Sequence, residues 1–489
     1  MTPPTLDLTQ TLTQEERQLE QKLIHRWMNL EPQDLVTVSH IKRFIERYEA
    51  DPDFRANIVT EPEATVAQHN LKIPPQEIRW LWDKDFVDEQ IAEGKSLPES
   101  IQLFLSYQDS NHQWMYRWRD RNPDSDPRFQ AWRARQVARG DSEIRKSHNS
   151  HILHAPVAFE LTKGCSVGCW FCGISAPRFS DIFRYTDENA QLWQETLKIV
   201  RDITGPAAGS GFCYWATDPM DNPDYENFID DFYRVLGVFP QTTTAQPLKD
   251  AQRTRSLLQH TEAKSFVQNR FSILSLKTLD ALYAEFSPEE LLHVGLALQN
   301  KESLLNKAIS GRTLARNKQK TDDNLPQSTI ACVSGFLFNM VERSVKLVSP
   351  TQADERWSNG YRIYAEATFT NAADLKILLE KMIAEHMPLA VRSDDIIRFR
   401  RDLKHENLVN GFKVSSPFLT LKFRRPYMRE LGEMIVSGKY TAAAIADSLS
   451  SLGVAAKDTF YALNVLFKRG VLDDEPNPSL GSRNLNNCD

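Results

Sequence analysis

The stretch ELTKGCSVGCWFCG, residues 160–173, carries three cysteines within eight residues, at Cys165, Cys169 and Cys172. It begins at the end of the apolar run PVAFEL (156–161), which has the length and composition of a buried β-strand. Only six cysteines occur in the whole chain, and this grouping is typical of metal binding in a reducing compartment rather than of a disulfide framework. The stretch therefore predicts a metal centre on a loop directly after a strand.

The spacing of this loop, C-x3-C-x2-C, favours an iron–sulfur cluster. Three thiolates can each bind one iron of a [4Fe–4S] cubane and leave the fourth iron open to a small chelating molecule. Structural zinc is the alternative, but such a site needs four ligands, usually from two paired knuckles, and no second pair follows. Three unrelated core thiols are a further alternative.

The segments around the loop predict three regions. Residues 1–150 have apolar positions at helical spacing and predict a helical region, with the loop-like run RNPDSDP (121–127) near its C-terminal boundary. In residues 151–395, short apolar runs alternate with helical segments, which predicts an α/β unit with a parallel sheet. The runs are PVAFEL, GFCYWA, QTTTA, FSILSL, STIACVSGFLF and YRIYAEATF. In residues 396–489, the hairpin-like FKVSSPFLTLKF precedes three candidate helices and a flexible tail, the outline of a winged-helix-like unit.

Composition limits the classes of partner. The chain has 489 residues and a formal net charge of −6, with acidic and basic residues well mixed, so it lacks the basic footprint of a protein that binds duplex nucleic acid. No apolar run reaches the about 18 residues that a membrane span needs, and the N-terminus lacks signal-peptide features. We therefore expect a cytoplasmic protein with neither nucleic acid nor membrane as a partner.

With Phe171 in the aromatic position, Cys165, Cys169 and Cys172 match CxxxCxΦC, and the sequence resembles the radical S-adenosylmethionine (SAM) superfamily. The resemblance implies a partial (β/α)6 barrel, one [4Fe–4S] cluster on the loop after the first strand, and SAM bound to the open iron. An electron donor such as flavodoxin or ferredoxin would reduce the cluster, and SAM would then yield a 5′-deoxyadenosyl radical that takes hydrogen from a substrate.

The same resemblance suggests which residues contact SAM. Such enzymes carry a Gly-Gly-Glu-like turn after the second strand, and here YWATDPMDNPDY (214–225) would offer Asp218 to the SAM ammonium. An ordinary Asp-Pro turn is the alternative role of Asp218. Polar residues at the ends of the third and fourth strands could meet the ribose and carboxylate of SAM, or be ordinary strand-end residues. They are Thr243, Thr244, Ser272 and Ser275.

Three downstream segments resemble the radical SAM peptide epimerases that mature ribosomally made peptides, including the proteusin group. They are FCYWATDPMDNPDYENF, IACVSGF and SPTQADERWSNGYRIY. In that family a lone cysteine returns a hydrogen atom to the Cα radical from the face opposite abstraction, which converts an L residue to a D residue. Cys332, in the expected fifth strand, matches this position, and Cys213 competes with it. Most lone buried cysteines are simply small hydrophobes, and Cys488 lies in the tail.

The unit after residue 396 resembles the recognition element that captures leader peptides in peptide-maturing enzymes. Such modules add the peptide as a strand to a sheet edge, which would make a ribosomal precursor peptide, leader and core, the partner. Three alternatives stay open: a DNA-binding winged helix in a redox-sensing regulator, a peptide cross-linking enzyme, or a methyl-transferring enzyme. Cross-linkers often bear extra clusters, which the cysteine count does not support.

Overall fold

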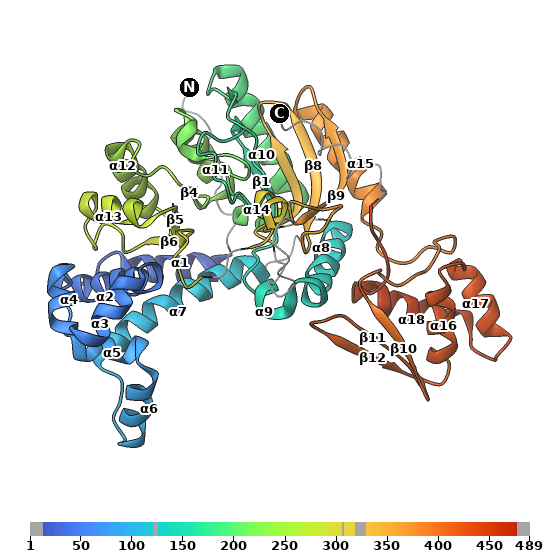
Figure 1. The fold of residues 1–489 in the computed structure, drawn as a ribbon. Coiled ribbons are helices and arrows are strands. Elements are labelled where there is room, and N and C mark those ends of the chain that lie inside the picture. Colours follow the sequence, from blue (N-terminus) through green and yellow to red (C-terminus); the bar gives the residue numbers. More distant parts are fainter. Residues whose placement is uncertain (1–12, 121–125, 306–307, 318–328, 477–489) are drawn as a thin grey trace.

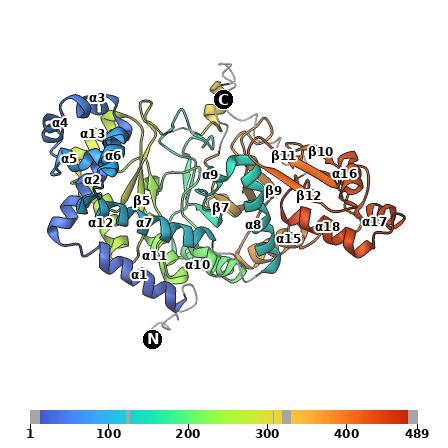
Figure 2. The ribbon, with the colours of Figure 1, turned by 90° about the horizontal axis from the view of Figure 1, so that it is seen from below.

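The structure is a computed structural model that describes residues 13–120, 126–305, 308–317 and 329–476; Cys488 lies outside them. It is a mixed α/β protein, as the sequence predicts. Figures 1 and 2 show the N-terminal helices at one end of the molecule, the C-terminal unit at the other, and the main sheets between them. Within the described ranges, no helix is long and apolar enough to cross a membrane.

The N-terminal part is helical throughout its described residues. Its elements are α1 (Gln14–Trp27), α2 (Pro32–Ala50), α3 (Pro52–Thr60), α4 (Pro62–Gln68), α5 (Pro75–Trp82), α6 (Lys84–Ala92), α7 (Glu99–Asp120), α8 (Pro127–Gly140), a π-helical turn η2 (Asp141–Arg145) and α9 (Lys146–Asn149). Five of these helices have proline as their first residue, where its fixed φ suits the first turn and its missing N–H needs no partner. The Asp residues at positions 51 and 126 accept hydrogen bonds from the first-turn N–H groups of α3 and α8.

The first main sheet has the order β1-β7-β8-β9. Strand β1 (Ala155–Glu160) pairs in parallel with β7 (Val333–Asn339), but β7, β8 (Ser344–Pro350) and β9 (Tyr361–Thr368) are antiparallel. The expectation of a parallel sheet is therefore wrong for this part. The connection between β7 and β8 has only the residues 340–343, and a connection this short can form a hairpin but not the crossover that parallel strands need.

A second sheet consists of three short parallel strands, β4 (Thr243–Thr244), β5 (Asn269–Ile273) and β6 (Val294–Leu298). The apolar run GFCYWA forms no strand; it joins the first sheet through one bridge, in which the Phe159 amide donates to the Phe212 carbonyl at 2.9 Å. The described residues form no closed barrel. Strands β6 and β8 are additional to those that the sequence predicts.

The other elements of this part surround the two sheets. They are the short strand pair β2 (Thr162–Lys163) and β3 (Asp181–Ile182), the helices α10 (Asp187–Thr204), α11 (Tyr225–Leu236), α12 (Ala251–Glu262), α13 (Leu276–Glu285), α14 (Arg312–Asn317) and α15 (Ala372–His386), and the 3-10 turns η3 (Gly205–Ser210) and η4 (Pro219–Asp221).

The C-terminal unit has its own hydrophobic core. Its antiparallel sheet, β10 (Lys404–Leu408), β11 (Gly411–Ser415) and β12 (Thr420–Arg424), is followed by α16 (Met428–Ser437), α17 (Ala442–Ser450) and α18 (Ala456–Lys468). The predicted hairpin and the three predicted helices are confirmed, and β10 is an additional strand.

A buried ionic network ties this unit to the rest of the protein. The carboxylate of Glu143 accepts hydrogen bonds from Arg139 at 2.6 Å and Arg362 at 2.7 Å, and Arg400 of the C-terminal unit lies 3.4 Å away. Burial would raise the pKa of Glu143, but the three guanidinium groups outweigh it and hold that pKa well below its usual range. Removing one partner of such a pair costs about 3–5 kcal/mol, because it leaves a buried charge without compensation.

Candidate functional site

A cavity of about 660 Å³ lies between the cysteine loop, the ends of β4 and β5, and helix α7. Cys165, Cys169 and Cys172 line one side of it, and Cys332 also lines it. Trp114 and Trp118 of α7 contribute to the lining from the N-terminal region. The structure thus brings the three motif cysteines and the predicted hydrogen donor to a single cavity.

Hydrogen bonds to two surrounding segments fix the first part of the cysteine loop. The Cys165 amide donates to the Pro177 carbonyl at 3.0 Å. The amide and hydroxyl of Ser166 donate to the two carboxylate oxygens of Asp221, at 2.9 and 2.6 Å. Burial would raise the pKa of Asp221, but hydrogen bonds from Ser166, Gln246 and Lys249 outweigh it and lower that pKa. Asp221 is therefore a charged anchor for the loop.

Arg312, at the start of α14, holds the second part of the loop. Its guanidinium donates to the Cys169 carbonyl at 2.7 Å and to the Ala176 carbonyl, and its amide donates to the Cys172 carbonyl at 3.0 Å. The preceding Gly311 has φ +56°, and a Cβ there would lie 2.4 Å from the Cys172 oxygen. Only glycine permits this close approach.

We expect Arg312→Ala to reduce cluster incorporation, because it frees two loop carbonyls from a charged donor, an interaction of about 1.5–3 kcal/mol each. The measurement is iron bound per chain after anaerobic reconstitution, together with the melting temperature. Arg184→Ala is the matched control, since its ion pair with Asp224 is on the surface (Arg184 side chain 57% exposed) and such pairs contribute little. Iron uptake by Arg312→Ala equal to that of the control would contradict this role.

The three motif thiols suit a metal centre by type and by shared location. Within the described residues, no group of three or more Cys, His, Asp or Glu side chains lies close enough to hold one metal ion, so these thiols are not gathered round a common point. Burial raises the pKa of Cys165 to about 12 and that of Cys169 to about 11. Both are thus neutral thiols at pH 7, and a bound cation would have to deprotonate them. The donor set matches an iron–sulfur cluster in residue type, and the gathering of the three thiols round a cluster stays a prediction.

Asp218 lines the cavity but is already well bonded. It caps η4 by accepting from the Met220 amide at 3.0 Å, and it accepts from the Thr244 hydroxyl at 2.7 Å and the Ala245 amide at 2.8 Å. Burial raises the pKa of Asp218. These contacts are those of an ordinary Asp-Pro turn, the alternative role that the sequence left open for Asp218. Its contact with the SAM ammonium stays a prediction.

The remaining predicted SAM contacts divide into two groups. Phe171, Thr243 and Ser272 line the cavity. Thr244 and Ser275 are not among its lining residues: the Thr244 hydroxyl donates to Asp218, and Ser275 caps α13 by accepting from the Thr278 amide at 3.1 Å. Ser275 lies beyond the end of β5, where the orphan N–H groups of the next helix are its nearest partners.

Cys332 immediately precedes β7 and is packed beside the cluster of buried side chains around β1. Its carbonyl accepts from the Ala155 amide at 2.8 Å. Strand β7 is therefore a neighbour of β1, not the fifth strand of a parallel series. Burial raises the pKa of Cys332 to about 11, although Arg270 opposes this, so its thiol keeps its hydrogen at neutral pH.

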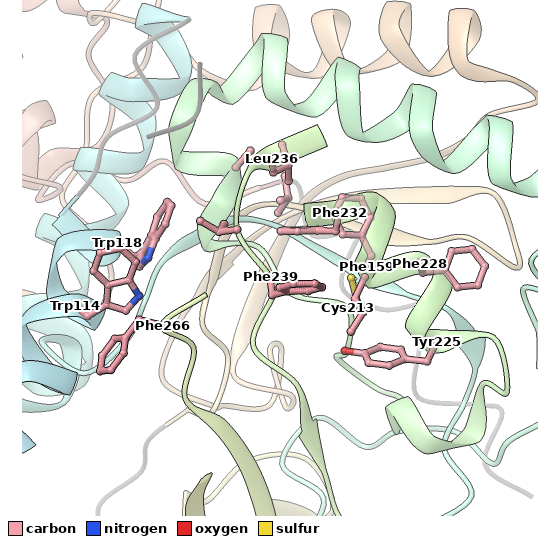
Figure 3. Close-up of a cluster of buried hydrophobic side chains, with 14 of the residues drawn as sticks. Trp114, Trp118, Phe159, Cys213, Tyr225, Phe228, Phe232, Leu236, Phe239 and Phe266 are labelled. Carbon is pink, nitrogen blue, oxygen red and sulfur yellow. The ribbon is translucent and has the colours of Figure 1, made fainter. Parts of the chain in front are cut away.

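Cys213, the competing candidate, is 1% exposed and is not among the cavity's lining residues. Figure 3 shows its sulfur among the rings of Phe159, Tyr225 and Phe232. Burial raises the pKa of Cys213 far above its usual range. The structure therefore gives Cys213 a packing role. Of the two candidate donors, Cys332 is the one whose residue lines the cavity.

Several lining or supporting residues were not found by sequence reasoning. Arg270 and Tyr214 line the cavity, α7 supplies two indoles, and Arg312 supports the loop. Arg312 lies 140 residues after Cys172 in the chain, and no spacing rule connects them. An isolated arginine within the short apolar strand NRFSI was the one available signal for Arg270.

Comparison with known proteins gives one relative. The chain is 37% identical over 461 residues to the uncharacterized protein y4wI of Sinorhizobium fredii (strain NBRC 101917 / NGR234), covering 91% of this chain and 89% of that protein. The chain belongs to the same family as y4wI. No family model matches the chain, and no solved structure matches it. The relative's name assigns no activity, so a functional conclusion depends on the cavity.

Proposed function

We propose that this protein is a radical SAM epimerase that converts L to D residues in a ribosomally made precursor peptide. The observation that carries the proposal is the joint position of four thiols: the three cysteines of the CxxxCxΦC motif and Cys332 line one cavity, whereas Cys213 does not. Strand β1 forms one parallel bridge with Phe212, and the parallel strands β4–β6 form a separate sheet; a partial radical SAM barrel is part of the proposal.

Cys165, Cys169 and Cys172 would hold one [4Fe–4S] cluster, and Phe171, Asp218, Thr243 and Ser272 would border SAM. A reduced cluster with bound SAM supplies a 5′-deoxyadenosyl radical that takes the Cα hydrogen of a residue. Arg312 and Asp221 keep the cysteine loop in place. The indoles of Trp114 and Trp118 restrict the space for water beside the substrate.

Cys332 would complete the inversion. Its S–H bond breaks homolytically as a new Cα–H bond forms, and the thiyl radical left on sulfur would be reduced by one electron from an external donor and protonated from water. Burial raises the pKa of Cys332 to about 11, with Arg270 opposing the rise, which favours the protonated thiol that a hydrogen-atom donor needs.

The decisive experiment is turnover in D2O. The reconstituted protein, SAM, a reductant and the candidate precursor peptide are incubated without oxygen, and the peptide is analysed by mass and by chiral analysis of its residues. An epimerase should place one deuterium on each inverted Cα, because the thiol of Cys332 exchanges with solvent. A loss of hydrogen from the peptide would indicate a cross-linking enzyme instead. A peptide that is unchanged although SAM is cleaved would show that the tested precursor is not the substrate.

We also propose that the free edge of β12 captures an acidic leader. In the described residues β12 pairs with β11 alone, and it carries the exposed basic side chains of Lys422 and Arg424. An added strand would gain main-chain hydrogen bonds and charge complementarity. Deleting the whole unit would test this poorly, since Arg400 belongs to the buried network round Glu143.

Replacing both Lys422 and Arg424 with Glu is expected to weaken leader binding on the order of 10-fold at low salt, because two attractive contacts become repulsive. The measurement is fluorescence anisotropy of a labelled leader at two salt concentrations. Lys439→Glu, on an exposed position outside β12, is the control. Equal affinity of the double variant and the control would remove leader capture from this edge.

A further inference from the structure

Arg270 brings a positive charge into the cavity from the second position of β5. Its guanidinium donates to the Thr243 hydroxyl at 3.2 Å and to the Tyr214 hydroxyl at 2.9 Å. Both partners are neutral hydroxyls, and they use two of the five N–H donors of a guanidinium. The contacts hold the group in one orientation without neutralising it.

No carboxylate among the residues that line the cavity forms an ion pair with Arg270. The lining includes two, Asp218 and Glu20. Asp218 is bonded to η4 and to the end of β4, and Glu20 accepts from the Phe266 amide at 3.3 Å. Within the described part of the chain, no ion pair joins Arg270 to an acidic side chain. Arg270 is half-buried in the cavity lining, and a charge withdrawn from bulk water usually has an anionic partner.

The other groups near Arg270 do not supply that charge. Tyr214 contributes most to raising the pKa of Arg270, burial lowers that pKa, and Cys332 raises it. At neutral pH, however, a phenol and a thiol are uncharged, so the guanidinium stays uncompensated. Arg270 lies towards Cys332, because its partner Tyr214 packs against the same buried cluster as Cys332, and Arg270 also opposes the rise in the pKa of Cys332.

We infer that Arg270, oriented by Tyr214 and Thr243, binds a carboxylate of the molecule that reacts beside Cys332. This inference rests on the proposed function, under which that molecule is the precursor peptide. It predicts that the preferred peptide carries an acidic residue next to the residue that is processed. A guanidinium fork binds a carboxylate through two parallel hydrogen bonds, which would fix the position of the peptide against the thiol.

The test is binding rather than turnover. The probes are N-acetyl-L-glutamate amide and its neutral isostere N-acetyl-L-glutamine amide, titrated into the full reconstituted chain while tryptophan emission is recorded, since Trp114, Trp118 and Trp215 line the cavity. The acidic probe should bind at least about 10-fold more tightly than the neutral one. Arg270→Gln should remove this preference, and Arg270→Lys should keep part of it.

Arg255→Gln is the control, because Arg255 pairs with Glu285 and Glu290 outside the cavity; it should bind both probes like the unaltered protein. Equal binding of the two probes, or an acid preference that survives in a folded Arg270→Gln protein, would overturn the inference. A matching loss of SAM affinity in Arg270→Gln would assign the arginine to the SAM carboxylate and also overturn it. If no D residue forms but Arg270→Gln loses the acid preference, the proposed function falls and the carboxylate site stands.

Discussion

Replacing any one of Cys165, Cys169 and Cys172 with Ala is expected to abolish the iron–sulfur chromophore and all SAM cleavage. Two thiolates cannot hold a cubane that leaves one iron open. The measurements are visible absorption, iron and sulfide content after anaerobic reconstitution, and the yield of 5′-deoxyadenosine. The expected loss is complete rather than graded.

Cys332→Ala is the control for this series, because Cys332 lines the same cavity but is not a motif cysteine. This variant should bind a normal cluster. Melting temperatures separate loss of the cluster from loss of the fold, because the three motif cysteines are only partly buried and their truncation leaves no large cavity. A motif variant that keeps its brown colour and cleaves SAM would disprove the cluster assignment.

The cysteine loop shows how far the sequence determines the candidate site. The spacing of three thiols on one loop is a local property, so it could be predicted, and so could the strand before it, now β1. The supports of the loop could not be predicted. Arg312 and Asp221 reach it from distant parts of the chain, and neither residue type is unusual enough in its own segment to indicate a contact.

The strands show a similar division. The apolar runs that form β1, β5, β7 and β9 can be found in the sequence because burial requires them to be apolar. Their directions cannot, because an alternating pattern does not distinguish a hairpin from a crossover. The turn at 340–343 makes β8 antiparallel, and β8 contains Lys346 among its apolar residues, which weakens its signal as a strand.

The cavity-lining side chains of α7 could be assigned to the cavity only from the tertiary structure. Helix α7 belongs to a region to which the sequence assigned no chemistry, yet its Trp114 and Trp118 line the cavity. Their helical spacing indicated only a buried face. Assigning that face to the cavity requires knowing that Phe239 and Phe266, far along the chain, line the same cavity. Figure 3 shows Trp114, Trp118 and Phe266 grouped together.

Replacing Cys332 with Ala is expected to abolish formation of D residues while leaving the cluster, SAM binding and hydrogen abstraction intact. The variant removes the one cavity-lining thiol outside the motif and nothing that supports the cysteine loop. We therefore expect 5′-deoxyadenosine to form, while the peptide keeps its L residues or ends as products of an unquenched radical. Chiral analysis of the peptide beside the 5′-deoxyadenosine yield measures both halves of the reaction.

Cys213→Ala is the matched comparison, because it removes a thiol of the same size from the aromatic cluster instead of the cavity (Figure 3). It should lower stability by about 1 kcal/mol through lost packing and still give D residues with deuterium from D2O. Cys332→Ser adds a second check, since a hydroxyl keeps the volume and polarity of the site but is a far poorer hydrogen-atom donor. If Cys332→Ala made D residues at the normal rate and Cys213→Ala did not, the donor would be Cys213, and the assignment of the cavity-facing thiol to the second half of the reaction would be wrong.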